Sequence, residues 1–398
     1  MKKLISIIGI SFLILGCEGV TNKKKYYQKE SIKEVRYKSD WVKNIDLKSF
    51  TDSSYRDDKG NFYFAGTEKR DGNSNFRVSK LDRNGKVLWS KSFDTQRVNF
   101  NGLITLDKDY NILLGGIEAN SHSDSESYNV VAMKISSDGE LIWSNSTSSP
   151  KSDLIHDVTT DSQGNFYIVG GATSNDKSNN SFIIKFSPDG KLEWRKTIDN
   201  NYYTNAYSIN IDKDDSIYVS GITGRDIFFA KYSISGDEKL KRVYKTEESE
   251  RSTRMCIGED SYIYISGYYK AKDDPKQLSF VKKMDKRGNQ IYFKLFDQID
   301  EQEYIHAIKA DKYGNVFVYG EYLLSKESKT KLFLTQLNGN GEIYSNLYFD
   351  GFSNFGNLGT KISLVLEDNS IYISGPGYIK LNGNEASKGT YILKLTKE

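Results

Sequence analysis

The fold of this chain is decided by the stretch Asp161-Ser-Gln-Gly-Asn-Phe-Tyr-Ile-Val-Gly170, followed after a variable loop by Ser181-Phe-Ile-Ile-Lys-Phe-Ser-Pro-Asp-Gly190-Lys-Leu-Glu-Trp194. Asp, Asn and Gly favour tight turns, whereas Tyr, Phe, Ile and Val favour strands. The first half therefore predicts a turn and a strand that ends in Gly. The second half predicts a strand, a tight turn and another strand.

This unit recurs seven times along the 398 residues, at intervals of 46 to 55 residues. The strand-ending glycines mark the copies: Gly66, Gly116, Gly170, Gly221, Gly267, Gly320 and Gly375. A repeat of this length with several short strands is typical of propeller blades, since one unit cannot bury both of its faces alone. We therefore expect an all-β fold, a seven-bladed β-propeller of four-stranded antiparallel blades. The strands of each blade are called A to D below.

Tight turns join strands A and B through the pattern Asp-x-x-Gly-Asn, in which the Asp carboxylate accepts hydrogen bonds from backbone NH groups. Three copies replace the turn Gly by Tyr110, Asp215 and Ser261, so those turns are expected to be looser or differently shaped. The connections from D to A and from B to C vary in length at the other end of each blade. We expect any ligand to bind at that variable end, since variable loops on a rigid scaffold commonly carry function.

Tryptophan also follows the repeat. Trp89, Trp143 and Trp194 each stand four residues after the turn Gly between strands C and D. A large ring at one repeat position is expected to pack one blade on the next.

The last copy ends after its strand C, so it lacks a strand D. The segment Trp41-Val-Lys-Asn-Ile45 resembles Trp89-Ser-Lys-Ser-Phe93, which is a strand D. We therefore expect Trp41–Ile45 to pair with Tyr391–Leu395 and close the ring, which removes an exposed edge. The propeller is predicted to span residues 41–398.

Residues 1–16 have the pattern of an export signal. Lys2 and Lys3 precede a 12-residue apolar run, which is too short to span a bilayer. The run leads to Gly16-Cys17 and resembles the lipobox of bacterial lipoproteins, which implies that Cys17 carries the lipid, with acyl chains such as palmitate. The chain would then be exported and anchored to a bacterial membrane, at the outer membrane or cell surface in a Gram-negative envelope. An ordinary secretory signal with a chance Cys is the alternative.

Charge is concentrated in the predicted tether, residues 17–40. Of the formal net charge of +3, the signal contributes +2 and the tether +3, which leaves the body at −2. A near-neutral body argues against a nucleic-acid partner, because engaging phosphates needs a basic surface. The basic tether is either a spacer beside anionic lipid headgroups or a solvated linker.

No metal or cofactor is expected. Asp107, Asp109, Asn111 and Glu118 match the spacing of several calcium ligands, but Ile112 replaces the Gly that an EF-hand loop needs. A hairpin turn explains the same residues. Cys256 lies in a predicted strand and is interpreted as a small buried residue.

The combination of Asp-x-x-Gly-Asn-x-Tyr-x-x-Gly with a later Lys and Gly-x-x-x-Trp resembles the bacterial SBBP repeat, named for seven-bladed β-propellers. The resemblance spans about 350 residues. It implies the fold and a secreted or surface setting, but no shared chemistry. The Gly-x-x-x-Trp element is also similar to quinoprotein propeller repeats and to the scaffold lipoprotein of outer-membrane assembly. The adjacent cysteine pair of quinoproteins is absent.

Two classes of function fit this sequence. One is a non-enzymatic binding or scaffold module for a protein, peptide or glycan. The other is a propeller enzyme, a lyase or hydrolase, with His156, Asp157 and His306 at the channel mouth. The two histidines share one repeat position, which Tyr207 and Asp52 occupy in other blades. The alternative is that the two histidines are half-buried residues of strand A, which share a position only because the repeat places them there.

Candidate ligand contacts are aromatic residues at the variable end, several of them beside Asn. Tyr and Asn together suit peptide or glycan surfaces, because they give contact area and adaptable hydrogen bonds. Rings that merely cover a neighbouring blade are the alternative. The candidates are Phe100, Tyr202, Tyr203, Tyr207, Phe352 and Phe355.

Overall fold

The computed structural model describes residues 37–70, 73–120, 128–147, 153–172, 180–198, 203–246, 248–272, 277–296, 302–324, 329–352, 361–367, 369–380 and 389–397. All of them belong to one compact unit, Glu34–Glu398. The described residues form 28 strands, and this part of the chain contains no helix with the length and hydropathy to cross a membrane.

Five antiparallel sheets have four strands each, in chain order from the inner to the outer strand. Sheet 1 comprises β2 (Phe50–Arg56), β3 (Phe62–Arg70), β4 (Asn73–Leu81) and β5 (Val87–Phe93). Sheet 2 comprises β6 (Val98–Leu106), β7 (Ile112–Ala119), β8 (Asn129–Ile135) and β9 (Leu141–Thr147). Sheet 3 comprises β10 (Asp153–Thr160), β11 (Phe166–Ala172), β12 (Ser181–Phe186) and β13 (Leu192–Ile198). Sheet 4 comprises β14 (Thr204–Ile211), β15 (Ile217–Thr223), β16 (Asp226–Tyr232) and β17 (Glu238–Tyr244). Sheet 5 comprises β18 (Ser249–Ile257), β19 (Ile263–Lys270), β20 (Gln277–Met284) and β21 (Gln290–Phe296).

The remaining strands form one eight-stranded sheet that consists of two four-stranded groups. Sheet 6 is the group β22 (Gln302–Ala310), β23 (Val316–Leu324), β24 (Lys329–Leu337) and β25 (Ile343–Phe352). Sheet 7 is the group β26 (Ser363–Glu367), β27 (Ser370–Lys380), β28 (Gly389–Lys397) and β1 (Tyr37–Ile45). A three-residue ladder between β25 and β27 joins the two groups.

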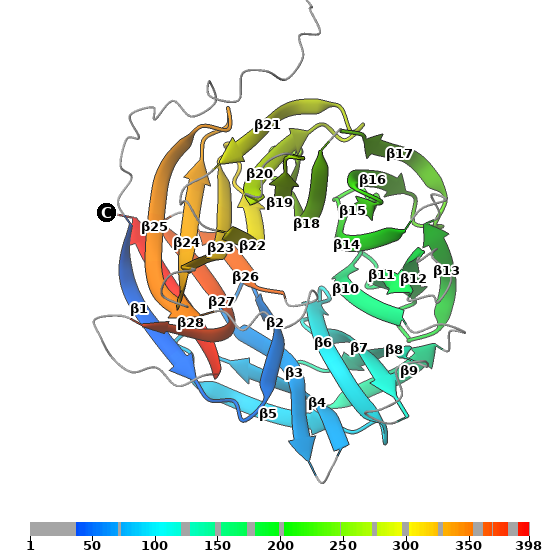
Figure 1. Cartoon of the computed structure of the whole chain (residues 1–398). Helices are drawn as coiled ribbons and strands as arrows, with labels where there is room; N and C mark the ends of the chain where they lie inside the picture. Colours follow the sequence, from blue (N-terminus) through cyan, green and yellow to red (C-terminus); the bar gives the residue numbers. More distant parts are fainter. Residues whose placement is uncertain are drawn as a thin grey trace, which may run out of the picture. The chain divides into compact units, whose positions relative to one another are not determined.

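Within this unit the sheets are arranged radially. Figure 1 shows the first strand of sheets 1 to 6 nearest the centre and β5, β9, β13, β17 and β21 on the outside. Inner strands of neighbouring sheets contact each other, for example β10 with β14 and β18 with β22. The expected all-β propeller with four-stranded antiparallel blades is therefore confirmed. The A–B and C–D turns lie at one end of the sheets, called the turn end, and the opposite end is called the loop end.

The N-terminal strand closes the ring as predicted. Trp41 lies opposite Lys394 and Ile45 lies opposite Thr390, in an antiparallel ladder of β1 with β28. The ladder begins at Tyr37, opposite Lys397, and is therefore four residues longer than the sequence pattern indicated. The Asn44 side chain adds two hydrogen bonds, donating to the Ile379 carbonyl at 3.0 Å and accepting from the Ile379 NH at 3.1 Å.

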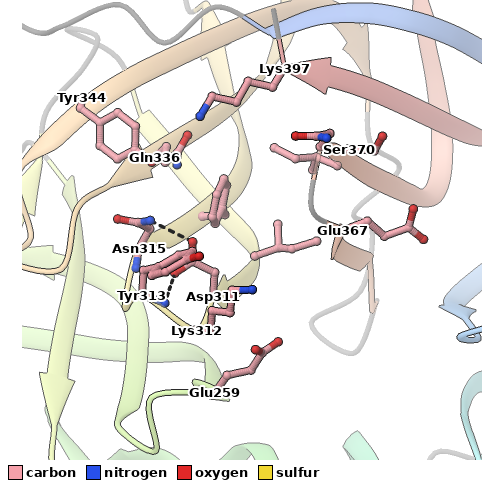
Figure 2. Close-up of a pocket in the computed structure, with 14 residues that line it drawn as sticks. Glu259, Asp311, Lys312, Tyr313, Asn315, Gln336, Tyr344, Glu367, Ser370 and Lys397 are labelled. Carbon is pink, nitrogen blue, oxygen red and sulfur yellow. Dashed lines mark hydrogen bonds between the residues drawn. The ribbon is translucent and has the colours of Figure 1, made fainter.

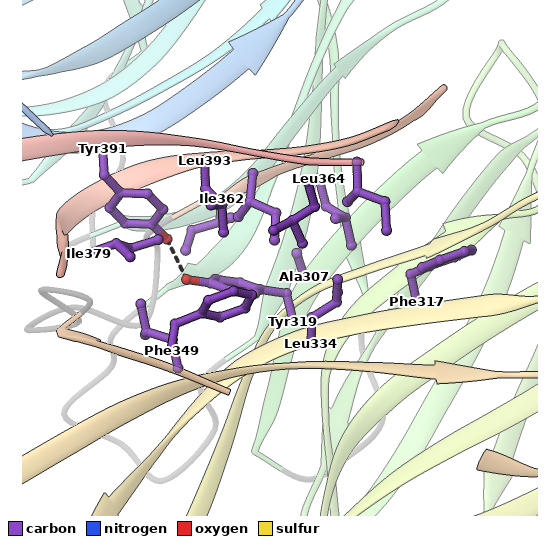
Figure 3. Packing of buried hydrophobic residues seen from close by; sticks show 14 residues of the cluster. Ala307, Phe317, Tyr319, Leu334, Phe349, Ile362, Leu364, Ile379, Tyr391 and Leu393 are labelled. Atoms are coloured by element: carbon purple, nitrogen blue, oxygen red, sulfur yellow. Dashed lines mark hydrogen bonds between the residues drawn. The ribbon is translucent and has the colours of Figure 1, made fainter. Parts of the chain in front are cut away.

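Apolar side chains fill the space between neighbouring sheets. Figure 3 shows the cluster between sheets 6 and 7, where the hydroxyls of Tyr319 and Tyr391 meet at 2.9 Å among Leu334, Phe349 and Leu393. Fully burying one side chain of the Leu or Phe class stabilises the fold by about 1.5–3 kcal/mol. Every inter-sheet contact of this kind therefore contributes to holding the ring together.

The tryptophans pack between sheets as expected. The indole NH of Trp89 donates to the Ser137 carbonyl at 3.2 Å, and that of Trp143 donates to the Pro188 carbonyl at 3.0 Å. Both acceptors lie in the C–D turn of the next sheet. A Cβ built on Gly139 would stand 3.1 Å from the Trp89 ring, so the turn glycine allows this close approach.

The turns without glycine correct the sequence expectation. Tyr110, Asp215 and Ser261 adopt positive φ angles of 61°, 55° and 65°. Each turn is closed by the same short backbone hydrogen bond as the glycine turns; for example, the Ser261 NH donates to the Gly258 carbonyl at 2.9 Å. The turns are neither looser nor differently shaped, because the hydrogen bonds of the hairpin impose the left-handed conformation on a residue that disfavours it.

Candidate functional site

Each inner strand of sheets 1 to 6 carries a β-bulge near its loop end. The register against the neighbouring strand shifts at Asp52, at Asn101 and Gly102, and at His156, Tyr207, Thr253 and His306. The four residues that the repeat alignment placed at one position are therefore all bulge residues. Bulges re-aim side chains and are common beside functional sites.

The strand-ending glycines are required by these bulges. A Cβ on Gly170 would lie 1.9 Å from the Leu154 carbonyl oxygen, and one on Gly221 would lie 1.9 Å from the Asn205 carbonyl oxygen. The same backbone approach occurs at Gly66, Gly267 and Gly320. Thus the glycine that defines the repeat in the sequence also marks the bulge in the structure.

His156 is buried beside Tyr207, with 4.9 Å between the ring centroids. Burial lowers the pKa of His156 to about 4, although the neighbouring Asn205 acts in the opposite direction. The imidazole is therefore neutral at neutral pH. Burial likewise raises the pKa of the Tyr207 hydroxyl, which keeps it protonated.

His306 occupies the equivalent place in sheet 6. Its Nε2 lies 3.5 Å from Glu321 Oε1, and burial lowers its pKa despite that carboxylate. The backbone carbonyl of His306 accepts a hydrogen bond from Arg254 Nε at 2.8 Å. The positive charge of Arg254 also disfavours protonation of both histidines.

Asp157 uses its whole carboxylate in structural contacts. Oδ1 accepts from the Val158 NH at 2.9 Å and from Lys361 Nζ at 2.7 Å. Oδ2 accepts from the Ser208 hydroxyl and the Ile209 NH, both at 3.1 Å. A carboxylate has about four lone-pair sites, so these donors leave no free site for proton abstraction.

Similar side-chain bonds link successive inner strands around the centre. Each joins a polar residue at or near a bulge to the backbone of the next sheet. They are Asp52 to Gly102, Asn101 to Ile155, Asp157 to Ile209, Asn210 to Met255, and Arg254 to His306. Of the residues that the sequence offered as a catalytic cluster, Asp157 thus holds neighbouring sheets together through its side chain, and His306 does so through its backbone carbonyl.

Arg254 was missed by the sequence analysis. It immediately follows a bulge in sheet 5, which is the repeat position of Asp157 in sheet 3. Extending the comparison of His156 and His306 by one residue would have shown it as the one cation among the aligned positions.

In five of these strands one residue lies two positions before the bulge at the loop end, and in β6 Phe100 directly precedes its two-residue bulge. These six residues are half-buried or exposed, whereas the residues beside them on the strand are largely buried. We call them the loop-end ring: Phe50, Phe100, Leu154, Asn205, Arg251 and Tyr304. Phe50 is 60% exposed.

Among the predicted aromatic contacts, Tyr203 is 39% exposed, next to the loop-end ring. Phe100 belongs to the ring but also packs against Tyr128, with 6.0 Å between centroids. Tyr207 is buried. Tyr202, Phe355, the Phe352 side chain and Cys17 lie outside the described residues.

The calcium-like stretch forms a hairpin turn. Asp107 accepts from the backbone NH groups of Asp109 and Asn111, both at 2.9 Å, and from Lys134 at 2.9 Å. Glu118 lies at the far end of β7, about 20 Å along the strand, in an ion pair with Arg97 at 3.4 Å. Burial raises the pKa of Cys256 to about 12, so its thiol is unreactive at neutral pH.

A cavity of about 700 Å³ lies at the turn end, between sheets 6 and 7. Figure 2 shows Asp311, Asn315 and Gln336 of sheet 6 facing Ser370 and Lys397 of sheet 7 across it. This cavity was not predicted from the sequence, which indicated ligand contacts at the loop end.

Solved structures resemble this fold. A protein from Lactobacillus plantarum has a TM-score of 0.52 at 12% identity, covering 83% of this chain and 95% of that protein. The polysaccharide lyase Uly1 has a TM-score of 0.50 at 10% identity, with coverage of 96% and 95%. The β-propeller domain of the Trilobed protease from Pyrococcus furiosus has a TM-score of 0.47 at 10% identity, with coverage of 84% and 96%.

No protein-family model matches the chain, and no curated protein matches it. The radial sheets of the structure define a β-propeller protein, and the likeness to the first two structures concerns the fold alone. At 10–12% identity they say nothing further about activity.

Proposed function

We propose that this protein is a lipid-anchored β-propeller of a bacterial cell envelope, built from SBBP-type repeats, which binds a protein, peptide or glycan at its loop end without catalysing a reaction. The loop-end ring carries this proposal. It places Phe50, Tyr304 and Arg251 at equivalent positions of rigid strands. Aromatic and arginine side chains dominate binding energy at protein interfaces, and rigid positioning lowers the entropy cost of binding.

Catalysis by His156, Asp157 and His306 has less support. Both histidines are buried, and the Asp157 carboxylate is fully engaged by four donors. A general base needs a lone pair within hydrogen-bond reach of the substrate proton. The likeness to a polysaccharide lyase concerns the fold alone.

Photo-crosslinking in the native envelope tests the binding proposal. A photoreactive phenylalanine analogue replaces Phe50, Tyr203 or Arg251, and the control positions are Leu88 and Leu141, which are exposed on outer strands. We expect a crosslinked product at two or more loop-end positions and none at the controls. Equal crosslinking at both sets, or none at the loop end of folded protein, contradicts the proposal.

The lipid anchor is tested at its own residue. Cys17→Ala removes the thiol that lipidation requires, so the variant should remain uncleaved or be released as a soluble protein. Detergent phase partitioning after export measures this. A variant that is still cleaved and still enters the detergent phase like the parent shows that Cys17 does not carry the anchor.

A further inference from the structure

The turn-end cavity lies where a repeated polar contact is interrupted. In sheet 5 Asp260 of the A–B turn accepts a hydrogen bond from the Tyr264 hydroxyl of strand B at 2.6 Å. In three other sheets the first carboxylate of the A–B turn accepts the same bond from the tyrosine of strand B. These pairs are Asp57 with Tyr63 at 3.0 Å, Asp161 with Tyr167 at 2.9 Å, and Asp212 with Tyr218 at 3.1 Å. Burial and the neighbouring carboxylate raise the pKa of these hydroxyls, so they remain donors.

In two sheets a lysine of strand C also contacts the turn carboxylate. Lys134 Nζ lies 2.9 Å from Asp107, and Lys283 Nζ lies 3.2 Å from Asp260. Lys283 also stands 4.3 Å from the ring centroid of Tyr262. At the turn end of sheet 5 an ammonium group therefore lies between a carboxylate and an aromatic ring.

Sheet 6 keeps the carboxylate and loses both donors. Phe317 replaces the tyrosine and Gln336 replaces the lysine. Asp311 Oδ1 accepts from two backbone NH groups of its turn, as in the other sheets. Within the described residues, Oδ2 accepts from Asn315 Nδ2 at 2.8 Å and from no tyrosine or lysine.

The connection between the first two strands of the neighbouring sheet is also shorter here. In sheet 5 the turn of the next sheet lies over the contact, and a Cβ on Gly314 would be 2.9 Å from Asp260 Oδ2 and 3.3 Å from Lys283 Nζ. The corresponding connection of sheet 7 runs between Glu367 and Ser370. Two residues separate these strands where five form the turn of sheet 6, and Glu367, Asn369 and Ser370 line the cavity.

We propose that this cavity binds a primary ammonium group on an aliphatic stem, as carried by lysine or by a diamine. The ligand's ammonium would occupy the place of the missing lysine, with Asp311 as its acceptor. Tyr344 lines the cavity with an aromatic ring, whereas the ring of Tyr313, which is 74% exposed, already has Lys312 Nζ 5.3 Å from its centroid. This site lies at the opposite end from the loop-end ring and does not depend on the function proposed there.

The charges around the cavity select between ammonium ligands. Glu259 and Asp311 favour a cation, whereas Glu367 is paired with Arg56. Lys312 and Lys397 also line the cavity and disfavour a second ammonium on the ligand that has no carboxylate beside it. A carboxylate or backbone carbonyl at the other end of the stem suits these two lysines, so lysine is expected to bind more tightly than a diamine.

Three probes of matched length test the proposal on the whole chain by isothermal titration calorimetry. L-lysine has the side-chain ammonium with an α-ammonium and a carboxylate at the other end of the stem, cadaverine has an ammonium at both ends and no carboxylate, and L-norleucine keeps the α-ammonium and carboxylate but lacks the side-chain ammonium. We expect a Kd of about 1 mM or tighter for lysine, weaker binding of cadaverine and none of norleucine. Tighter binding of cadaverine identifies polyamines as the source of the ammonium. Equal binding of norleucine, or no binding of lysine and cadaverine, overturns the proposal.

Gln336→Lys fills the site from within, since lysine occupies this repeat position in sheets 1 to 5. The variant should bind lysine at least about tenfold more weakly and melt at a higher temperature than the parent. Gln290→Lys is the matched control, because it adds the same charge at an exposed position of sheet 5. Phe317→Tyr restores the hydroxyl donor and provides a second test. Parental affinity for lysine in either folded variant shows that the cavity is not the site.

Discussion

The strand-ending glycine is the residue on which each bulge depends. At Gly170 the neighbouring carbonyl oxygen already occupies the space of a Cβ. The steric conflict is with backbone, so it cannot be relieved by moving a flexible side chain. The bulge in turn places His156 and frees Asp157 for its contact with the next sheet.

Gly170→Ala should therefore destabilise the fold by about 1–3 kcal/mol, the usual cost of forced overpacking. The control is Gly339→Ala, where the nearest atom would be 3.4 Å away and φ is not positive. Urea unfolding of both variants measures the difference in free energy. Equal stability of the two would show that the backbone adjusts without cost.

The turns without glycine store strain that a substitution can release. Ser261→Gly should stabilise the protein by about 0.5–1 kcal/mol, because a non-glycine residue at positive φ costs about 1–2 kcal/mol. Asp215→Gly should gain less, since Asp215 accepts hydrogen bonds from the Ser162 NH and hydroxyl. Thermal melting of the two variants compares them, and a lower melting temperature for Ser261→Gly contradicts the strain argument.

Among the strands, β1 is the one on which closure of the ring depends. It completes sheet 7 and covers β28 with Trp41 and Val42, which pack against apolar clusters on the two sides. Without it, β28 would expose a row of unpaired backbone groups at the edge of the sheet.

Deletion of residues 1–45 should lower the free energy of unfolding by about 3–5 kcal/mol or cause aggregation, through the lost ladder and the lost apolar burial. The control is a chain that begins at Tyr37 and keeps the whole strand. Thermal unfolding and light scattering report the outcome. If both chains melt at the same temperature and stay monomeric, β1 does not hold the ring closed.

The strand pattern, the order of strands and the pairing of β1 with β28 could all be predicted from the sequence, because seven aligned copies show which segment is missing. The conformation of the Tyr110 turn could not be predicted from the sequence, because hairpin hydrogen bonds override the preference of tyrosine for negative φ. The bulges could not be predicted either, although a strand-ending glycine such as Gly170 is the residue that the bulge requires.

The candidate site was predictable only in part. Repeat alignment placed His156 and His306 at equivalent positions, but their burial and the contact of Arg254 with His306 depend on packing between sheets. The cavity was visible in the sequence as Phe317 and Gln336, two departures from the repeat. The sequence does not show that residues of sheet 7 line one cavity with these two residues, because that depends on how the two sheets pack.

For the whole molecule, two ionisable groups on inner strands, one buried and one half-buried, oppose each other in their dependence on pH. Burial lowers the pKa of His156 from 6.5 to about 4, so its contribution to stability is present above pH 6.5 and is lost as the pH falls towards 4. Burial raises the pKa of Asp52 from 3.8 to about 7, so its contribution is present below pH 3.8 and is lost as the pH rises towards 7.

Single variants should separate these two effects. Relative to the parent, His156→Phe should gain stability as the pH is lowered from about 6.5 to 4, and Asp52→Asn should gain stability as it is raised from about 4 to 7. Urea unfolding at a series of pH values measures both differences. Curves that run parallel to the parent across this range would show that neither group titrates differently in the folded and unfolded states.

Closure by β1 also sets the order in which the molecule can mature. β1 ends at Ile45, and its partner β28 begins at Gly389, so the first strand to be synthesised can pair only after the last has been synthesised. Contacts between such distant segments form slowly, because chain closure has to precede them. Sheets 1 to 5 each consist of consecutive strands and can assemble as the chain emerges, whereas sheet 7 cannot. A chain truncated near either terminus would therefore lack a strand of sheet 7 and expose unpaired backbone groups, which would make it a substrate for quality-control proteases.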